Sequence, residues 1–152
     1  MNRKEYKKCC DDEVDWTTLD QLHEATLQIS NQCFEYKKLC VGILGVVVTA
    51  LLKVEPKTSF SIIALVCIVI SCGFWICDTT AYFYQKANRK VMSDVISKIK
   101  TRNEVKIENK SLKVYSWSQA FFNRSMHLYY YIFFVCFTVI LIENLFWVER
   151  TY

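Results

Sequence analysis

Glycine and proline are scarce in this 152-residue chain, which contains three glycines and one proline. Sandwiches and barrels of many short strands need turn residues at short intervals, and disordered or collagen-like chains are rich in one or both of these residues. The sequence therefore excludes these classes and favours long, unbroken helices. Charge is also absent from three long segments, which are Leu39–Leu52, Thr58–Cys77 and Ser125–Ile142.

The three charge-free segments predict three membrane-spanning helices. A span needs about 20 apolar residues, a length that the second segment reaches alone and the third reaches when it is extended to residue 147. The first segment is short enough to be a buried core helix instead. We favour a span because only loop 53–57 separates it from the next segment and because Lys38 and Lys53 can reach the two interfaces. The predicted spans are residues 39–53, 58–77 and 125–147.

The distribution of basic residues predicts the orientation of these spans. Segments 1–38 and 78–124 carry six and ten Lys or Arg residues, whereas loop 53–57 carries two and the tail after Ile142 carries one. Because cytoplasmic loops are the more basic ones, we place 1–38 and 78–124 in the cytoplasm. Residues 1–38 show no apolar core of a signal peptide, so we expect a cytoplasmic N-terminus and a C-terminus on the opposite side.

Two apolar stripes are predicted on the cytoplasmic helices. Residues 17–38 begin with capping-box spacing at Thr17 and Thr18 and read as an amphipathic helix that can run straight into the first span. The second span continues without Gly or Pro to residue 100, which predicts a rod of about 43 residues. The stripes either pack on each other within one chain or pack between subunits. The stripe of the first helix consists of Leu19, Leu22, Thr26, Ile29 and Cys33. The stripe of the second consists of Tyr84, Ala87, Val91, Val95 and Ile99.

The remaining cytoplasmic segment breaks the helical pattern. Apolar and polar residues alternate over 105–115, which predicts a small β-hairpin, and Ser116 with Gln119 has the capping-box spacing that starts a last helix. The predicted fold is an all-α membrane protein with three transmembrane helices, a hairpin plus a C-terminal span. Cytoplasmic helical extensions and the small β-hairpin complete one domain over residues 1–152.

No group of residues in the sequence points to an enzyme. His23 and His127 have no His or Cys at ligand spacing, and the chain has no nucleophile motif and no glycine-rich phosphate loop. The eight cysteines form no C-x-x-C, and none lies clearly on the outer side, so we expect small packing residues and no disulfides. We predict no catalytic residue, no metal site and no cofactor.

Two features of the spans predict helix packing. Gly42, Gly45 and Thr49 share one face of the first span, and small residues let helix backbones approach closely in lipid. That face packs either on the second span of the same chain or between subunits. Asp78 directly follows the longest charge-free segment, so it requires a partner from a neighbouring helix or subunit, or faces interfacial water. Arg89 lies three turns further along and is too distant to be that partner.

The stretch Lys86–Lys113 carries nine basic residues against three acidic ones. One interpretation is a positive face beside anionic lipid, and the other is recruitment of a nucleotide signal or nucleic acid. Aromatic residues do not alternate with these charges, so base stacking has little support and we expect no nucleic-acid partner. The basic cytoplasmic face consists of Lys86, Arg89, Lys90, Lys98 and Lys100.

A motif of about fifteen residues resembles small bacterial membrane proteins of the RipA-like and SLATT type. Trp75-Ile-Cys-Asp78, Tyr82 and Gln85-Lys-Ala-Asn-Arg89 are similar to the family pattern Trp-x-x-Asp…Glu-x-x-x-Arg, with Gln85 in place of the usual Glu. The plan is similar too, with a cytoplasmic N-terminal helix, a transmembrane hairpin and a helix that leaves the membrane. The third span is not part of the minimal family plan.

The resemblance implies a homo-oligomer in the bacterial inner membrane, octameric in the RipA-like case. With the orientation predicted from the basic residues, the C-terminus would then lie in the periplasm. It also implies a pore-forming effector in anti-phage defence that a cytoplasmic sensor triggers. Trp75, Asp78 and Arg89 would be structural residues of the oligomer at the membrane boundary. The alternative is a non-conducting anchor, scaffold or regulatory (immunity) subunit whose basic face recruits a cytoplasmic partner.

Overall fold

The computed structural model describes residues 9–54, 58–103 and 116–151, and these residues form helices and short connections without any strand. This confirms the all-α class for that part of the chain, and the β-hairpin predicted over 105–115 lies outside it. The elements are α1 (Cys10–Val54), α2 (Phe60–Arg102), α3 (Trp117–Phe121), the 3-10 helix η1 (Arg124–Met126) and α4 (His127–Thr151).

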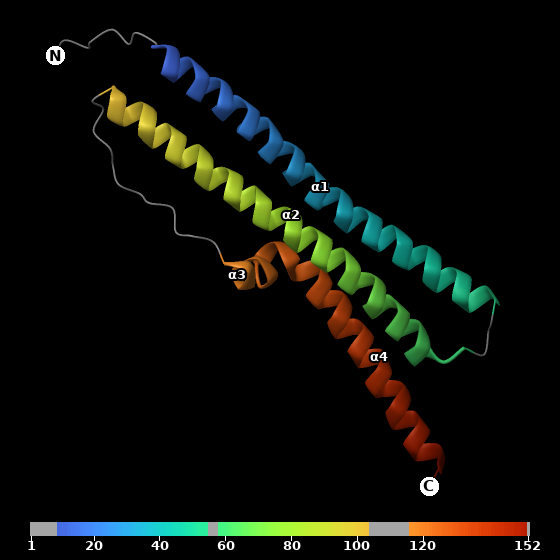
Figure 1. Ribbon diagram of the computed structural model, residues 1–152. Helices are drawn as coiled ribbons and strands as arrows, with labels where there is room; N and C mark the ends of the chain where they lie inside the picture. The colour runs from blue at the N-terminus through green and yellow to red at the C-terminus, as the bar shows by residue number, and fades with distance from the viewer. Residues whose placement is uncertain (1–8, 55–57, 104–115, 152) are drawn as a thin grey trace, which may run out of the picture.

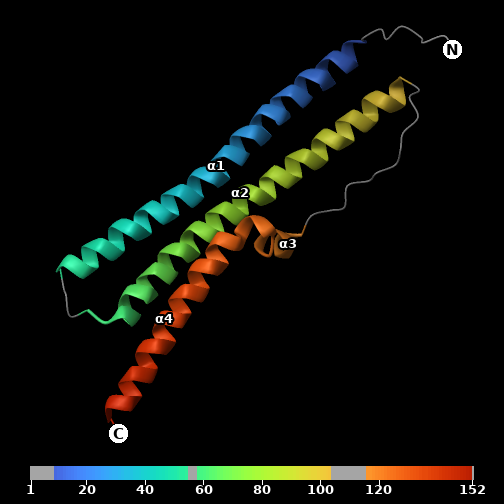
Figure 2. The same ribbon diagram turned by 180° about the vertical axis from the view of Figure 1, so that it is seen from behind.

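The two long helices α1 and α2 form an antiparallel hairpin and lie side by side along their whole length (Figure 1). The helix α4 begins beside the middle of α2 and runs toward the end of the hairpin where α1 stops and α2 starts, as the reverse view also shows (Figure 2). One half of the hairpin is therefore a three-helix assembly, whereas the other half consists of α1 and α2 alone.

The helix α1 starts earlier than the sequence predicted. Thr17 and Thr18 lie inside the helix, where their hydroxyls donate to the carbonyls of Glu13 and Val14 at 2.9 Å. The first turn contains Asp11, Asp12 and Glu13, and carboxylates stabilise that end of a helix because they face its positive dipole. The predicted capping-box start is wrong, but the expected unbroken passage from residues 17–38 into the first apolar segment is confirmed.

The helix α2 has 43 residues, the length predicted for the rod, and begins two residues later than predicted. The hydroxyl of Ser59 caps its first turn by accepting a hydrogen bond from the Ser61 backbone at 3.2 Å. With 1.5 Å per residue, this helix is about 65 Å long. No Gly or Pro interrupts the stretch from Asp78 to its end, so its apolar and charged halves form one rigid element.

The last long helix begins later than predicted. The backbone N–H of Ser116 donates to Gln119 Oε1 at 3.3 Å, so the capping box exists, but it starts only the five-residue α3. Asn123 adopts an extended backbone conformation and separates α3 from η1, and α4 begins at His127. The chain thus makes a compact turn before entering its last apolar helix.

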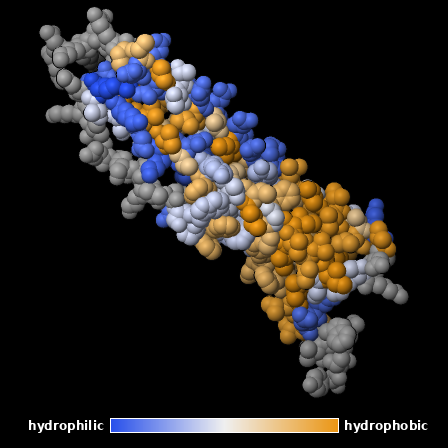
Figure 3. All heavy atoms as spheres, viewed as in Figure 1, coloured by the Kyte–Doolittle hydropathy of each residue, from blue (hydrophilic) through white to orange (hydrophobic). Residues whose placement is uncertain are grey.

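Two helical stretches are long and apolar enough to cross a membrane, α2 and residues 124–146. The helix α1 is not among them, so the prediction of three spans is confirmed for two helices only. Lys37, Lys38 and Lys53 bracket its charge-free stretch, which is shorter than the roughly 20 apolar residues of a typical span. Apolar residues gather at the three-helix end of the molecule and hydrophilic residues at the other (Figure 3).

The three-helix half has two small hydrophobic cores. The first joins α2 and α4 through Ile63, Ala64, Cys67 and Cys136, with Leu44, Val48 and Leu51 of α1 packed against it. The second contains Cys40, Met126 and Tyr129, which are completely buried. Three of the eight cysteines therefore occupy positions where small apolar side chains let the helices approach closely.

Candidate functional site

A polar cluster lies where the three charge-free segments begin or end. Lys37 of α1 places its Nζ 2.6 Å from Asp78 Oδ2 of α2 and 3.4 Å from Ser125 Oγ of η1. The apolar segments start at Leu39, end at Cys77 and start again at Ser125, so these three boundaries coincide in space. We call Cys33, Lys37, Asp78, Ser125 and Tyr129 the boundary cluster.

The Asp78 carboxylate is completely buried, and Lys37 supplies a partner from a neighbouring helix, which is one of the alternatives that the sequence left open. Two more side chains of the boundary cluster, Cys33 and Tyr129, lie against this carboxylate. Burial, and then the adjacent Asp78 carboxylate, raises the pKa of the Cys33 thiol to about 12. A buried carboxylate without a counter-charge would cost several kcal/mol, so Lys37 is the residue that makes Asp78 tolerable here.

Trp75 ties the boundary to the final helices. Its ring makes edge-to-face contacts with Phe121, Tyr130 and Phe133 at centroid distances of 5.3, 6.0 and 5.8 Å. The Tyr130 hydroxyl donates to the Phe121 carbonyl at 2.5 Å, which fixes the turn between α3 and α4. Aromatic residues favour the level of lipid headgroups, so this ring group is consistent with a membrane interface.

Three later residues of the Trp75–Arg89 motif lie beside a cavity, further along α2 than the Trp75 contacts. Tyr82, Gln85 and Arg89 line a cavity of about 420 Å³ between α1 and α2, and Lys37 and Ser125 reach into its wall. Gln85 is buried, whereas Arg89 is exposed. Lys37 therefore contacts Asp78 and also lines this cavity, and Arg89 lies at the cavity rim.

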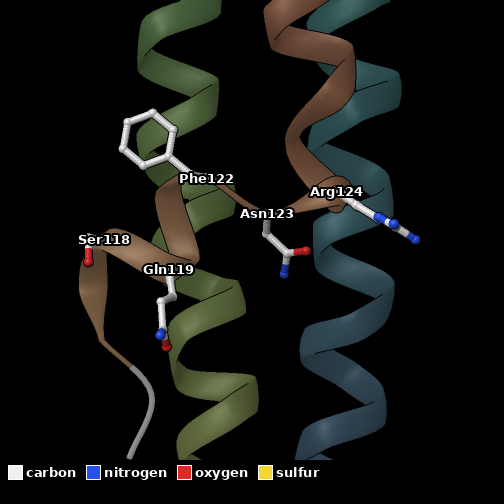
Figure 4. A pocket seen from close by; sticks show the side chains of 5 residues that line it. All are labelled: Ser118, Gln119, Phe122, Asn123 and Arg124. Carbon is white, nitrogen blue, oxygen red and sulfur yellow. The ribbon is translucent and has the colours of Figure 1, made fainter.

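A second cavity, of about 530 Å³, lies on the surface of α3 and η1 (Figure 4). Its lining consists of Ser118, Gln119, Phe122, Asn123 and Arg124. Phe122 and Arg124 point in different directions instead of meeting at a common centre. Arg124 is the one titratable side chain among these described lining residues, so this hollow offers little chemistry.

The stripe predicted on α1 faces α2 of the same chain. Thr26 and Cys33 are buried, and Thr26 Oγ1 lies 3.9 Å from Met92 Sδ. The remaining stripe residues are partly buried, and they are Leu19, Leu22 and Ile29. Of the two packings that the sequence left open, the structure contains the one within a chain.

The stripe predicted on α2 packs within the chain only in its second half. Val95 and Ile99 are buried as predicted, but Tyr84 and Val91 are 56% and 46% exposed and point away from α1. Buried or partly buried residues of α2 also recur every seven positions, as in a coiled coil, whereas four-residue steps drift around the helix. This heptad series consists of Asp78, Gln85, Met92 and Ile99.

The small-residue face of α1 does not pack on α2. Gly42, Gly45 and Thr49 are exposed, and a Cβ added at either glycine would meet nothing within 4 Å. The Thr49 hydroxyl only donates back to the Gly45 carbonyl, at 2.7 Å. Packing of this face on the second span of the same chain is therefore wrong, which leaves contact with another molecule.

The basic cytoplasmic face divides into two groups. Lys86 and Lys90 are partly buried, and Lys86 Nζ lies 5.3 Å from the centre of the Tyr82 ring. Arg89, Lys98 and Lys100 are exposed. Of this face, Lys86 and Arg89 line the cavity at the boundary cluster.

Two contacts that the sequence did not reveal fasten the ends of the hairpin. Arg102 bonds to the nearly fully buried Asp12 at 2.9 Å and also to Asp15, and hydrogen bonding to Asp15 raises the pKa of Arg102. At the other end, Glu143 of α4 accepts hydrogen bonds from the hydroxyls of Ser59 and Ser61 at 2.7 and 2.6 Å. Pairs this distant along the chain leave no local sequence signal.

Comparison of the chain with protein-family models, curated proteins and solved structures found no match. Within the ranges that the structure describes, no group of three or more His, Cys, Asp or Glu side chains is arranged to hold a metal ion. The boundary cluster and its cavity are therefore the features on which a function can be argued.

Proposed function

We propose that the protein is a homo-oligomer of the bacterial inner membrane, with a cytoplasmic N-terminus, three passes per chain and a periplasmic C-terminus. The argument for the third pass is packing. Leu44, Val48 and Leu51 of α1 pack on the charge-free part of α2, so a membrane that contains this part of α2 also contains residues 39–53 of α1. Lys38 and Lys53 then reach the two interfaces.

The observation that carries the proposal of self-assembly is an outer apolar stripe on α1. Leu27, Phe34 and Val41 recur every seven residues, are 53%, 60% and 53% exposed, and continue into Gly45 and Leu52. Lipid can cover the membrane part of this stripe. Leu27 lies ten residues before Lys37, which places it about 15 Å into the cytoplasm, where only another protein surface can bury it.

A second copy of the chain is the partner that this stripe favours. Gly45 within the stripe and the adjacent Gly42 allow close approach of another helix backbone, and a seven-residue spacing suits helix pairing across the membrane surface. The resemblance to the RipA-like and SLATT type points to the same arrangement. In such an assembly the helices α1 and α2 connect the cytoplasmic and membrane parts rigidly, so a cytoplasmic sensor could act on the spans.

We infer that the assembled protein acts as a pore-forming or membrane-perturbing effector, as the family resemblance implies for anti-phage defence. The test is the mass of the purified protein in detergent together with dye release from liposomes. We expect an assembly of one size, eight copies if it is RipA-like, that releases dye. A monomer that leaves the liposomes intact under every trigger would overturn both parts of the proposal.

A matched pair of glycine substitutions tests whether the outer apolar stripe of α1 mediates assembly. Gly45→Leu adds bulk on the outer stripe and should reduce the assembly to smaller species. Gly73→Leu adds the same bulk on α2, at an exposed glycine that also has nothing within 4 Å, and should leave the mass unchanged. An unchanged mass for Gly45→Leu in an otherwise oligomeric protein would assign assembly to a different face.

The second candidate function is a non-conducting membrane scaffold or regulatory subunit. The exposed Lys98 and Lys100 on α2 favour it, because a basic cytoplasmic surface can recruit an acidic partner. Neutral replacement of both residues should then abolish recruitment and leave the oligomer intact. Dye release by the purified protein alone would favour the effector instead.

A further inference from the structure

The cavity beside the boundary cluster is lined by cations from two helices. Lys37 comes from α1, and Lys86 and Arg89 come from α2, while the neutral polar side chains of Ser30, Gln85 and Ser125 complete the polar wall. Among the described residues that line this cavity of about 420 Å³, none is a carboxylate. Lys37 is paired with Asp78, so Lys86 and Arg89 leave an excess of positive charge around a hollow whose described lining carries no carboxylate, and the potential of such a site attracts an anion.

Arg89 is the group in this cavity with unused bonding capacity. It forms no ion pair and no hydrogen bond with any residue in the described ranges, whereas Lys37 already neutralises Asp78. A guanidinium presents donors in a planar fork that matches two oxygens of a phosphate, and a nearby ammonium adds a point charge. The hydroxyl of Ser125 and the Gln85 amide provide further polar contacts at the same level.

The height of the cavity selects the source of the phosphate. Its lining begins at Lys37 and Ser125, which lie where the charge-free segments of α1 and α4 begin, and extends past Tyr82 to Arg89. Arg89 lies three turns beyond Asp78, and its long side chain can extend back toward the membrane surface. Phosphates of the cytoplasmic leaflet occupy this level next to the spans. Basic pockets between transmembrane helices on the cytoplasmic side are known to take anionic headgroups.

We propose that this cavity binds the phosphate of an anionic phospholipid headgroup, with Arg89 as its main ligand and Lys86 as its second cation. A bound headgroup would bridge α1, α2 and η1 at the membrane surface and so join all three helices of the membrane half. The site belongs to a single chain, so the inference rests on the proposed membrane orientation but not on the proposed assembly or on membrane perturbation.

The test measures how strongly the full-length protein retains lipid. Protein in detergent is titrated with phosphatidylglycerol or with phosphatidylcholine, and bound lipid is counted by native mass spectrometry. We expect preferential retention of phosphatidylglycerol, and about tenfold weaker binding after R89Q, because one charge-assisted hydrogen-bond donor is lost. Arg89 is exposed, so the replacement should not disturb the helix pair, and an unchanged circular dichroism spectrum verifies this.

The matched control is K98Q, which removes the same charge from an exposed position on α2 outside the cavity. It should bind phosphatidylglycerol as the wild type does. Equal loss in both variants, or equal retention of the two lipids, would overturn the proposal because either result indicates general surface attraction. A second experiment adds glycerol phosphate to protein that contains only phosphatidylcholine. If glycerol phosphate bound as tightly as phosphatidylglycerol does, the cavity would be assigned to a soluble phosphate compound and the lipid assignment would be overturned.

Discussion

Lys37 and Asp78 form the ion pair on which the centre of the molecule depends. The Asp78 side chain has no exposed surface and the Lys37 side chain is 20% exposed. Water and salt therefore screen this pair only weakly. Burial of both charges is costly, and their attraction offsets that cost only while both are present. The pair therefore fixes the register of α1 against α2 more than it adds stability.

Replacement of one member of this pair should be far more damaging than replacement of both. We expect Lys37→Met to lower the free energy of unfolding by roughly 3–5 kcal/mol, because Asp78 is left charged and buried. The double variant Lys37→Met/Asp78→Leu should recover most of that loss. Denaturant titration in detergent, followed by circular dichroism, measures both.

The control for this prediction is the neighbouring lysine. Lys38 pairs with Glu35 at 2.7 Å, but both side chains are more than half exposed. Lys38→Met should therefore cost less than about 1 kcal/mol. If Lys37→Met and Lys38→Met were equally mild, the buried ion pair would have no structural importance.

The Cys33 thiol should resist alkylation at neutral and mildly alkaline pH. Burial raises its pKa from 9.0 to about 12, and only the thiolate reacts. Because the folded pKa is the higher one, the contribution of the neutral thiol to stability is complete below about pH 9 and is lost as the pH rises toward about 12. The rate of maleimide labelling in a variant that retains only Cys33 should rise through that range.

A variant that retains only Cys10, which is exposed at the start of α1, provides the comparison. It should label rapidly at about pH 8, where the Cys33 variant stays almost unlabelled. Rapid labelling of Cys33 at that pH would show that the boundary cluster is open to water.

The two long helices are held as a pair by contacts at intervals along their length. The Asp12–Arg102 ion pair closes one end, Thr26 meets Met92 further along, and Lys37 meets Asp78 at the boundary. Asn103 adds a hydrogen bond from Nδ2 to Asp12 Oδ2 at 3.0 Å. An isolated helix pair of this length would otherwise open at its free end, where few neighbours cover it.

Loss of the Arg102 contacts should release that end locally. We expect Arg102→Met to increase amide hydrogen exchange over residues 10–15 and 99–102, because Asp12 loses the cation that compensates its burial. Exchange near the boundary cluster should stay as in the wild type. Lys100→Met, which removes an exposed charge two residues earlier, should change neither region, and faster exchange along the whole hairpin would contradict this local role.

At the scale of the whole molecule, three helices share one apolar slab. The Lys37–Asp78–Ser125 contacts define its inner face, and Glu143 with Ser59 and Ser61 defines the other. From Ser61 to Asp78, the helix α2 rises about 26 Å, close to the thickness of a bilayer core. The half of the hairpin that consists of α1 and α2 alone projects beyond this slab (Figure 1).

Spin labels should report this arrangement as a set of membrane depths. Labels at Val46, Val69 and Phe134, which are 70%, 64% and 70% exposed on three different helices, should be accessible to oxygen and shielded from water-soluble relaxants. Labels at Lys38 and Arg124 should lie at a common interfacial depth. Water accessibility of Val46 alone would remove α1 from the membrane and leave two spans.

The long helices follow from the sequence because their determinants are local. The scarcity of Gly and Pro and the periodic apolar residues predicted the length of α2 and the continuity of α1. The starts of the first and last long helices were mispredicted. Capping-box spacing is present at Thr17, Thr18 and Ser116, but these two helices begin at other residues, Cys10 and His127. The spacing of residues along the chain shows where a helix cap is possible, but it does not determine at which of the possible residues the helix begins.

The sequence by itself determined where charge is absent and how far the helices run, and it singled out Asp78 as a boundary carboxylate that either has a partner or faces water. Only the tertiary structure decided that Lys37 is this partner, that Val91 turns outward and that Gly42 and Gly45 remain uncovered. The physical reason is the rotation of one helix against the other. A shift of a single residue turns a helix by about 100°, and the choice among such rotations is made by contacts between residues that are far apart in the chain.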